Sequence, residues 1–114
     1  MSLSEAQVKQ AVEEYLQYQQ NLGKLFYLRL NSGDAFINRG GKSYKIQLCP
    51  KGTADLMVIQ ISQDYPTPII TFVELKSSKG KQSPEQVEFA MQIVKFNCGY
   101  IVVRSVEELM EWLN

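Results

Sequence analysis

Residues 52–76, GTADLMVIQISQDYPTPIITFVELK, decide how this chain folds. Two apolar runs rich in β-branched residues, 56–61 and 69–73, lie on either side of a QDYPTP segment. Apolar runs of this length are typical of strands, and the two prolines interrupt regular structure between them. The stretch therefore predicts two neighbouring strands joined by an irregular turn.

Three charged residues flank the two predicted strands. Asp55 precedes the first strand, whereas Glu74 and Lys76 leave the second strand on one face, because side chains alternate along a strand. If the strands pair antiparallel, the start of one meets the end of the other, and two carboxylates converge with one ammonium group. Such a group can bind Mg²⁺ beside a phosphate. The alternative is a structural ion-pair cluster, since an E-x-K triplet is common by chance.

Length and composition limit the possible functions. The 114 residues are 45% hydrophobic and 21% charged, which predicts a single globular domain over residues 1–114. No apolar run approaches the roughly 20 residues that cross a bilayer, so we expect no membrane partner and a cytoplasmic location. The chain has no histidine, and its two cysteines lack CxxC spacing, which argues against a zinc site. Any metal would therefore be bound by carboxylates.

The flanking sequence predicts a mixed sheet covered by helices, which is an α/β fold. Capping patterns and apolar periodicity predict helices over 4–20, after Ser83 and after Ser105. The expected strands are 24–30 and 100–103, with a Gly-Gly hairpin over 34–49. On the second helix, the residues expected to face the core are Val87, Phe89, Ala90, Met91 and Val94.

Basic residues cluster on both sides of the carboxylates, although twelve basic and twelve acidic residues cancel overall. One stretch without acidic residues precedes Asp55 and contains Arg39, Lys42, Lys45 and Lys51. Another follows Lys76 and contains Lys79 and Lys81. Their position favours contact with phosphate groups. The alternative is an ordinary solvated loop surface.

An ordered set of short motifs resembles the VRR-NUC branch of the PD-(D/E)xK nuclease superfamily. The set comprises Glu5 on the first helix, RLNSG at 29–33, GTAD at 52–55, ELK at 74–76 and SPEQ at 83–86, which contains Gln86. Ala54 stands where the superfamily pattern has proline. The resemblance extends from Ser4 to Val103 and implies a restriction-endonuclease-like mixed central sheet flanked by helices.

The resemblance also implies a Mg²⁺- or Mn²⁺-dependent DNA endonuclease that leaves a 5′-phosphate and a 3′-hydroxyl. The implied metal ligands are Asp55, Glu74 and the main-chain carbonyl of Leu75, with Glu5 as an outer ligand. Lys76 would serve the attacking water and the phosphate, Gln86 would orient phosphate or metal-bound water, and Arg29, Asn31 and Ser32 would contact nucleic acid. Glu5 and Gln86 each also have a structural explanation. Glu5 would interact favourably with the dipole at the start of its helix, and Gln86 would be an ordinary residue on a helix surface.

A small domain without a separate DNA-reading module predicts recognition of DNA shape, best matched by branched DNA or a Holliday junction. Symmetric cleavage of a junction needs two active sites, so we expect a homodimer that resembles phage-type resolvases. The alternatives are a flap or nicking nuclease, a non-catalytic DNA-binding module of the same fold, and a protein-interaction domain with an incidental carboxylate pair.

Overall fold

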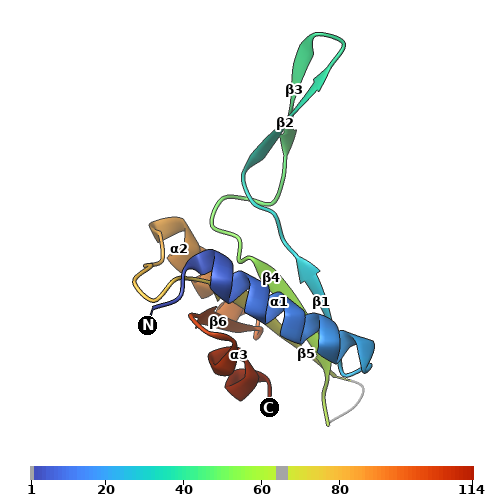
Figure 1. Cartoon of the computed structure of the whole chain (residues 1–114), viewed down its shortest axis with the longest axis vertical. Coiled ribbons are helices and arrows are strands. Elements are labelled where there is room, and N and C mark those ends of the chain that lie inside the picture. The colour runs from blue at the N-terminus through green and yellow to red at the C-terminus, as the bar shows by residue number, and fades with distance from the viewer. Residues whose placement is uncertain (1, 64–66) are drawn as a thin grey trace.

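The computed structural model describes residues 2–63 and 67–114 as a mixed sheet flanked by helices (Figure 1). The elements in chain order are α1 (Glu5–Asn21), β1 (Leu25–Arg29), β2 (Asp34–Arg39), β3 (Lys42–Gln47), β4 (Leu56–Ile61), β5 (Pro68–Leu75), α2 (Pro84–Lys95), β6 (Gly99–Val103) and α3 (Val106–Leu113). The main sheet has the order β1-β4-β5-β6, in which β5 and β6 pair parallel, whereas β1 with β4 and β4 with β5 pair antiparallel. The predicted α/β class with a mixed, helix-flanked sheet is confirmed.

The helices begin where the capping residues predict. Ser4 and Gln7 form a reciprocal capping box at α1, and Ser83 and Gln86 form a second one at α2, where Pro84 occupies the first helical position. These contacts satisfy backbone N–H groups that have no partner inside the helix.

Within the described ranges, no helix has the length and apolar character needed to cross a membrane.

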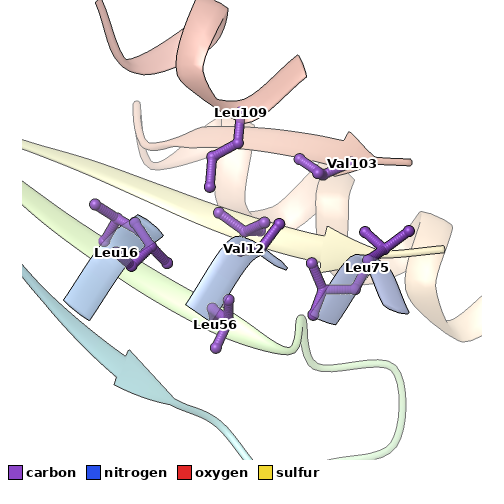
Figure 2. Packing of buried hydrophobic residues seen from close by; sticks show 9 residues of the cluster. Val12, Leu16, Leu56, Leu75, Val103 and Leu109 are labelled. Carbon is purple, nitrogen blue, oxygen red and sulfur yellow. The ribbon is translucent and has the colours of Figure 1, made fainter. Parts of the chain in front are cut away.

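The hydrophobic core lies between one face of the sheet and the helices α1 and α3 (Figure 2). Val12 and Leu16 of α1 contribute fully buried side chains, as does Leu109 of α3. The sheet supplies alternate residues, among them Leu56 and Val103, because residues two apart share a face. This packing fixes the edge of the sheet at which β4 begins and β5 ends.

Helix α2 lies on the opposite face of the sheet and contacts it through Phe89. The Phe89 ring meets Phe72 edge-on at 5.5 Å between ring centroids and lies 6.2 Å from Tyr100. The predicted core-facing side of α2 is correct for Phe89 and wrong for Val87, Met91 and Val94, which are exposed. Apolar spacing marks one side of a helix, but the side that contains Phe89 is the one turned toward the sheet.

The pairing of β4 with β5 is antiparallel, as expected, with Leu56 opposite Val73 and Ile61 opposite Pro68. The predicted turn between the strands is partly wrong, since Pro68 is the first residue of β5 and not part of the turn. A proline is tolerated at the first position of a strand. Residues 64–66 of that turn lie outside the described part of the chain.

The predicted Gly-Gly hairpin is confirmed and forms a sheet of its own that projects from the body (Figure 1). Gly40 and Gly41 both have positive φ, 60° and 76°, as a two-residue primed turn requires. Strands β2 and β3 lie in the chain between β1 and β4. The hairpin therefore leaves the main sheet near the residue that precedes β4, Asp55.

Candidate metal and nucleic-acid site

Gly52 brings the loop before β4 against the start of α2. Its φ is +93°, and a Cβ atom at this position would lie 2.5 Å from the backbone oxygen of Glu85. Only glycine tolerates both this backbone conformation and this close approach. Lys51 and Glu85 add an ion pair of 3.5 Å across the same contact. The loop that carries Asp55 is thereby held next to the helix that carries Gln86.

Asp55 lies at the junction of three strands. Its Oδ2 accepts a hydrogen bond of 2.7 Å from the backbone N–H of Leu75, and its backbone oxygen accepts one of 2.8 Å from Leu30. The first bond joins the start of β4 to the end of β5, and the second joins it to the end of β1. The carboxylate of Asp55 is therefore fixed beside Glu74, the residue before Leu75.

Glu74 is a buried carboxylate with one unsatisfied oxygen. The residue is 2% exposed, and its Oε2 accepts a hydrogen bond of 3.0 Å from Nε2 of Gln86. The side-chain amide oxygen of Gln86 accepts a hydrogen bond of 2.8 Å from the backbone N–H of Ser83. This bond fixes the orientation of the amide. Within the described chain, Oε1 of Glu74 has no hydrogen-bond partner. Buried polar atoms are rarely left without a partner, so this oxygen requires an explanation.

Burial raises the pKa of the Glu74 carboxyl to about 8 from an ordinary value of 4.5, with a hydrogen bond to Asp55 and the charge of Asp55 as further causes. The positive charge of Lys76 acts in the opposite direction, and the charge of Glu5 adds a smaller upward contribution. When Glu74 is protonated, it shares a hydrogen bond with Asp55; when it is ionised, Oε1 has no donor. A bound cation could take the place of that proton, because it also neutralises the negative charge of the carboxylate pair.

The structure brings together most of the residues proposed for the metal site. Asp55, Glu74 and Gln86 are connected directly or through Leu75, and Lys76 is near enough for its charge to act on Glu74. Glu5 is exposed in the first turn of α1 and contributes through its charge, so its role as an outer ligand remains a prediction. In residues 2–63 and 67–114, no three or more His, Cys, Asp or Glu side chains form a metal-binding group.

The predicted nucleic-acid-binding residues divide into two groups. Three are ion-paired: Arg29 with Glu13, Lys45 with Asp34 at 3.4 Å, and Lys51 with Glu85 at 3.5 Å. Pairing offsets their charge, which weakens the case for phosphate contact. The other four predicted cations form no ion pair within the described residues and are exposed: Arg39, Lys42, Lys79 and Lys81.

Asn31 and Ser32 lie at the base of the hairpin and act there through their backbone. The backbone oxygen of Asn31 accepts a hydrogen bond of 2.9 Å from the backbone N–H of Cys49. Ser32 forms an isolated parallel β-bridge with Cys49. Both side chains are on exposed residues. Their contact with nucleic acid stays a prediction; both follow Leu30, whose N–H bonds to the backbone oxygen of Asp55.

Three further residues near the carboxylates were not predicted from the sequence. The side chain of Gln82 donates 3.0 Å to the hydroxyl of Tyr100, and Arg104 donates to two backbone oxygens of the loop after Lys76. Burial raises the pKa of the Tyr100 hydroxyl, and the charges of Glu74 and Asp55 raise it further. Parallel pairing places Tyr100 on the face of Glu74, but the register of β6 cannot be read from a run of apolar residues.

This arrangement is suited to a hard divalent cation. Two carboxylates face each other across a strand pair, one oxygen is buried without a donor, and the amide of Gln86 holds the other oxygen in place. Carboxylate oxygens are the ligands that Mg²⁺ and Mn²⁺ prefer. The residues present therefore fit the ion that the sequence predicted.

Comparison with protein-family models, curated proteins and solved structures finds no match to this chain. The resemblance to VRR-NUC nucleases therefore remains a hypothesis that depends on the motifs and on the geometry of the site.

Proposed function

We propose that this chain is a Mg²⁺- or Mn²⁺-dependent DNA endonuclease. One observation carries the proposal: the buried Glu74 has an oxygen without a partner beside the carboxylate of Asp55. A buried, unpaired carboxylate pair is costly unless a proton or a cation neutralises it. Perturbed carboxyl groups of this kind are typical of functional sites.

Asp55 and Glu74 would hold the ion, and the carbonyl of Leu75 is the proposed main-chain ligand. When bound, the ion supplies Lewis-acid stabilisation of the scissile phosphate. The chain's own groups have separate roles: Lys76 places positive charge where charge develops on the phosphate and orients the attacking water, and Gln86 keeps Glu74 in one orientation. Because the capping box fixes the Gln86 amide, this support is built before any ligand binds.

The position of the hairpin favours DNA as the substrate. Arg39 and Lys42 lie opposite each other next to the Gly-Gly turn, at the end farthest from the main sheet. Lys79 and Lys81 are exposed on the loop that follows Lys76. Cations on both sides of the carboxylates can bind separate stretches of a phosphate backbone, which suits a branched DNA or junction. The chain would then act in the cytoplasm as a homodimer.

Incubation of the purified protein with labelled linear, flap and four-way DNA tests the proposal. We expect cleavage of branched DNA that requires Mg²⁺ or Mn²⁺ and is abolished by chelation. Asp55→Asn and Glu74→Gln should lose cleavage while keeping the fold, because each removes an anionic ligand and preserves shape. Glu88→Gln, on the exposed side of α2, is the matched control and should retain activity.

The products separate the proposal from its alternatives. Paired symmetric cuts in four-way DNA identify a junction resolvase, whereas cuts confined to flaps or single strands identify a flap or nicking enzyme. DNA binding without cleavage in either metal would contradict the endonuclease and support a non-catalytic module. Unchanged turnover in Asp55→Asn or Glu74→Gln would show that the site lies elsewhere.

A further inference from the structure

Arg104 follows β6 and lies against the loop that leaves Lys76. Its Nη1 donates a hydrogen bond of 2.7 Å to the backbone oxygen of Ser77 and one of 2.6 Å to the backbone oxygen of Gly80. The N–H of Gly80 also bonds to the oxygen of Ser77, at 3.2 Å, which closes a turn. Hydrogen bonds from a charged guanidinium are stronger than those between neutral groups. Arg104 is therefore the principal side-chain support of the turn from Ser77 to Gly80.

This turn packs against the side chain of Lys76. A Cβ atom on Gly80 would lie 3.2 Å from Oγ of Ser77, 3.3 Å from Cδ of Lys76 and 3.5 Å from Cβ of Lys76. The backbone N–H of Lys76 is bonded at 3.0 Å to the oxygen of Val103, the residue before Arg104. The end of β6 thus fixes the backbone of Lys76 directly and its alkyl chain through the turn.

The far end of the same loop is also attached to β6. The side chain of Gln82 donates a hydrogen bond of 3.0 Å to the hydroxyl of Tyr100, the second residue of that strand. Ser83 follows and caps α2, which carries Gln86. The loop between Lys76 and α2 is therefore supported from β6 at two places.

We propose that Arg104 is a positioning residue that holds the ammonium group of Lys76 toward the Asp55–Glu74 pair, acting through the turn from Ser77 to Gly80. This inference rests on the proposed role of Lys76 in the nuclease reaction. Lysine has a flexible four-carbon stem, so packing along that stem restricts where its ammonium lies. Arginine suits the support, because its planar group can donate to two carbonyls in fixed directions.

Variants at Arg104 test the support without depending on activity. Arg104→Met removes the donors and keeps an unbranched chain, and Arg104→Lys keeps the charge. Lys24→Met is the charge-matched control, because Lys24 precedes β1 at the end opposite to Leu30, which bonds to Asp55. In Arg104→Met we expect hydrogen exchange of residues 77–82 to rise roughly tenfold or more, with protection of β4 and β5 unchanged. Labelling of the Lys76 amine by an acylating reagent should rise as well.

Cleavage provides the second measurement. With enzyme in excess over branched DNA and with Mn²⁺ present, the maximal single-turnover rate constant of Arg104→Met should fall about tenfold or more, while the enzyme concentration giving half-maximal rate stays the same. Arg104→Lys should recover part of the rate, and Lys24→Met should match the wild type. A simple loss of folded protein would not give this separation of rate from affinity.

Two results would overturn the inference. If exchange of residues 77–82 and labelling of Lys76 are unchanged in Arg104→Met, Arg104 does not position the loop, whether or not the wild type cleaves DNA. If the loop loosens but the cleavage rate is unchanged, its position does not matter for Lys76. Absence of cleavage by the wild type would contradict the proposed nuclease activity. The exchange and labelling results would then still decide whether Arg104 positions the turn and Lys76.

Discussion

Glu74 shows why burial and charge conflict in this site. Removing a carboxylate from water is unfavourable, and the neighbouring Asp55 adds repulsion, so the metal-free protein keeps a proton on Glu74 up to a pH of about 8. The hydrogen bond from Gln86 satisfies one oxygen and leaves Oε1 without a donor. A proton and a divalent cation are the two groups that relieve the conflict, and they exclude each other.

The first prediction follows from this competition. Since the pKa of Glu74 is about 8, a proton must leave when an ion binds near neutral pH. We expect Mn²⁺ affinity to rise as pH increases from about 6.5 to 8.5, with close to one proton released per ion at pH 7. Calorimetry in buffers of different ionisation enthalpy measures this number. Affinity that is independent of pH over this range would contradict the assignment of Glu74 as a ligand.

The second prediction concerns stability without metal. The pKa of Glu74 is raised in the folded chain, so the folded state binds more protons than the unfolded state between pH 4.5 and about 8. Stability contributed by the protonated form is present at low pH and is lost as pH rises through this window. Glu74→Gln avoids the loss, so relative to the wild type it should gain about 3.5 kcal/mol in stability between pH 5 and pH 8.

Thermal or urea unfolding in the presence of a chelator measures this difference. Glu88→Gln removes an exposed carboxylate from α2 and should not change stability with the same pH dependence. A wild type that becomes more stable relative to Glu74→Gln as pH rises from 5 to 8 would show that the sign is wrong.

At the level of secondary-structure elements, the hairpin of β2 and β3 gives the third prediction. Arg39 and Lys42 are exposed and form no ion pair within the described chain, unlike Lys45. Each phosphate contact adds about 0.9 to the slope of log affinity against log salt on duplex DNA. Replacing Arg39 and Lys42 with alanine should weaken binding and flatten this slope by about two contacts' worth.

A salt series with junction and linear duplex DNA measures the slopes. Lys24→Ala combined with Lys95→Ala removes the same charge elsewhere and should leave the slope nearly unchanged. If the hairpin variant has the wild-type slope, its cations do not touch phosphate and belong to a solvated loop. Cleavage at saturating DNA should persist, because neither Arg39 nor Lys42 contacts the carboxylate pair.

Local signals in the sequence account for most of the elements. Ser4 with Gln7 and Ser83 with Pro84 predict helix starts because a hydroxyl or amide at these positions bonds to neighbouring N–H groups. Two adjacent glycines predict the hairpin turn, since both adopt positive φ. Phe89 of α2 was predicted correctly to face the core, but Val87, Met91 and Val94 were not, because the sequence spacing does not show how much of the apolar side meets the sheet.

The site was predictable only in part. Alternation along the strands and antiparallel pairing place Asp55 beside Glu74, which the sequence pattern already indicated. The contact of Gly52 with Glu85 and the support by Arg104 depend on how distant segments approach in three dimensions. No local rule relates residue 52 to residue 85, and the parallel register of β6 has no turn to define it.

For the molecule as a whole, the hairpin determines the shape. The radius of gyration is 15.7 Å, larger than the roughly 13 Å of a compact chain of this length. The longest dimension, 52 Å, reflects a hairpin that extends away from the sheet and helices (Figure 1). Because its strands connect β1 to β4, its base is next to Asp55. DNA held by the hairpin tip would therefore extend beyond the body of one subunit.

The fourth prediction tests the proposed homodimer through the products that mixed subunits make. A single copy offers one Asp55–Glu74 pair, whereas symmetric resolution of a four-way junction needs two cuts. We expect a sedimentation mass of about twice 13.0 kDa. Wild type mixed with excess Glu74→Gln and refolded together should then give mainly junctions nicked on one strand, since most active subunits have an inactive partner. If the subunits act alone, the mixture will still resolve junctions completely, only more slowly, and the homodimer would be contradicted.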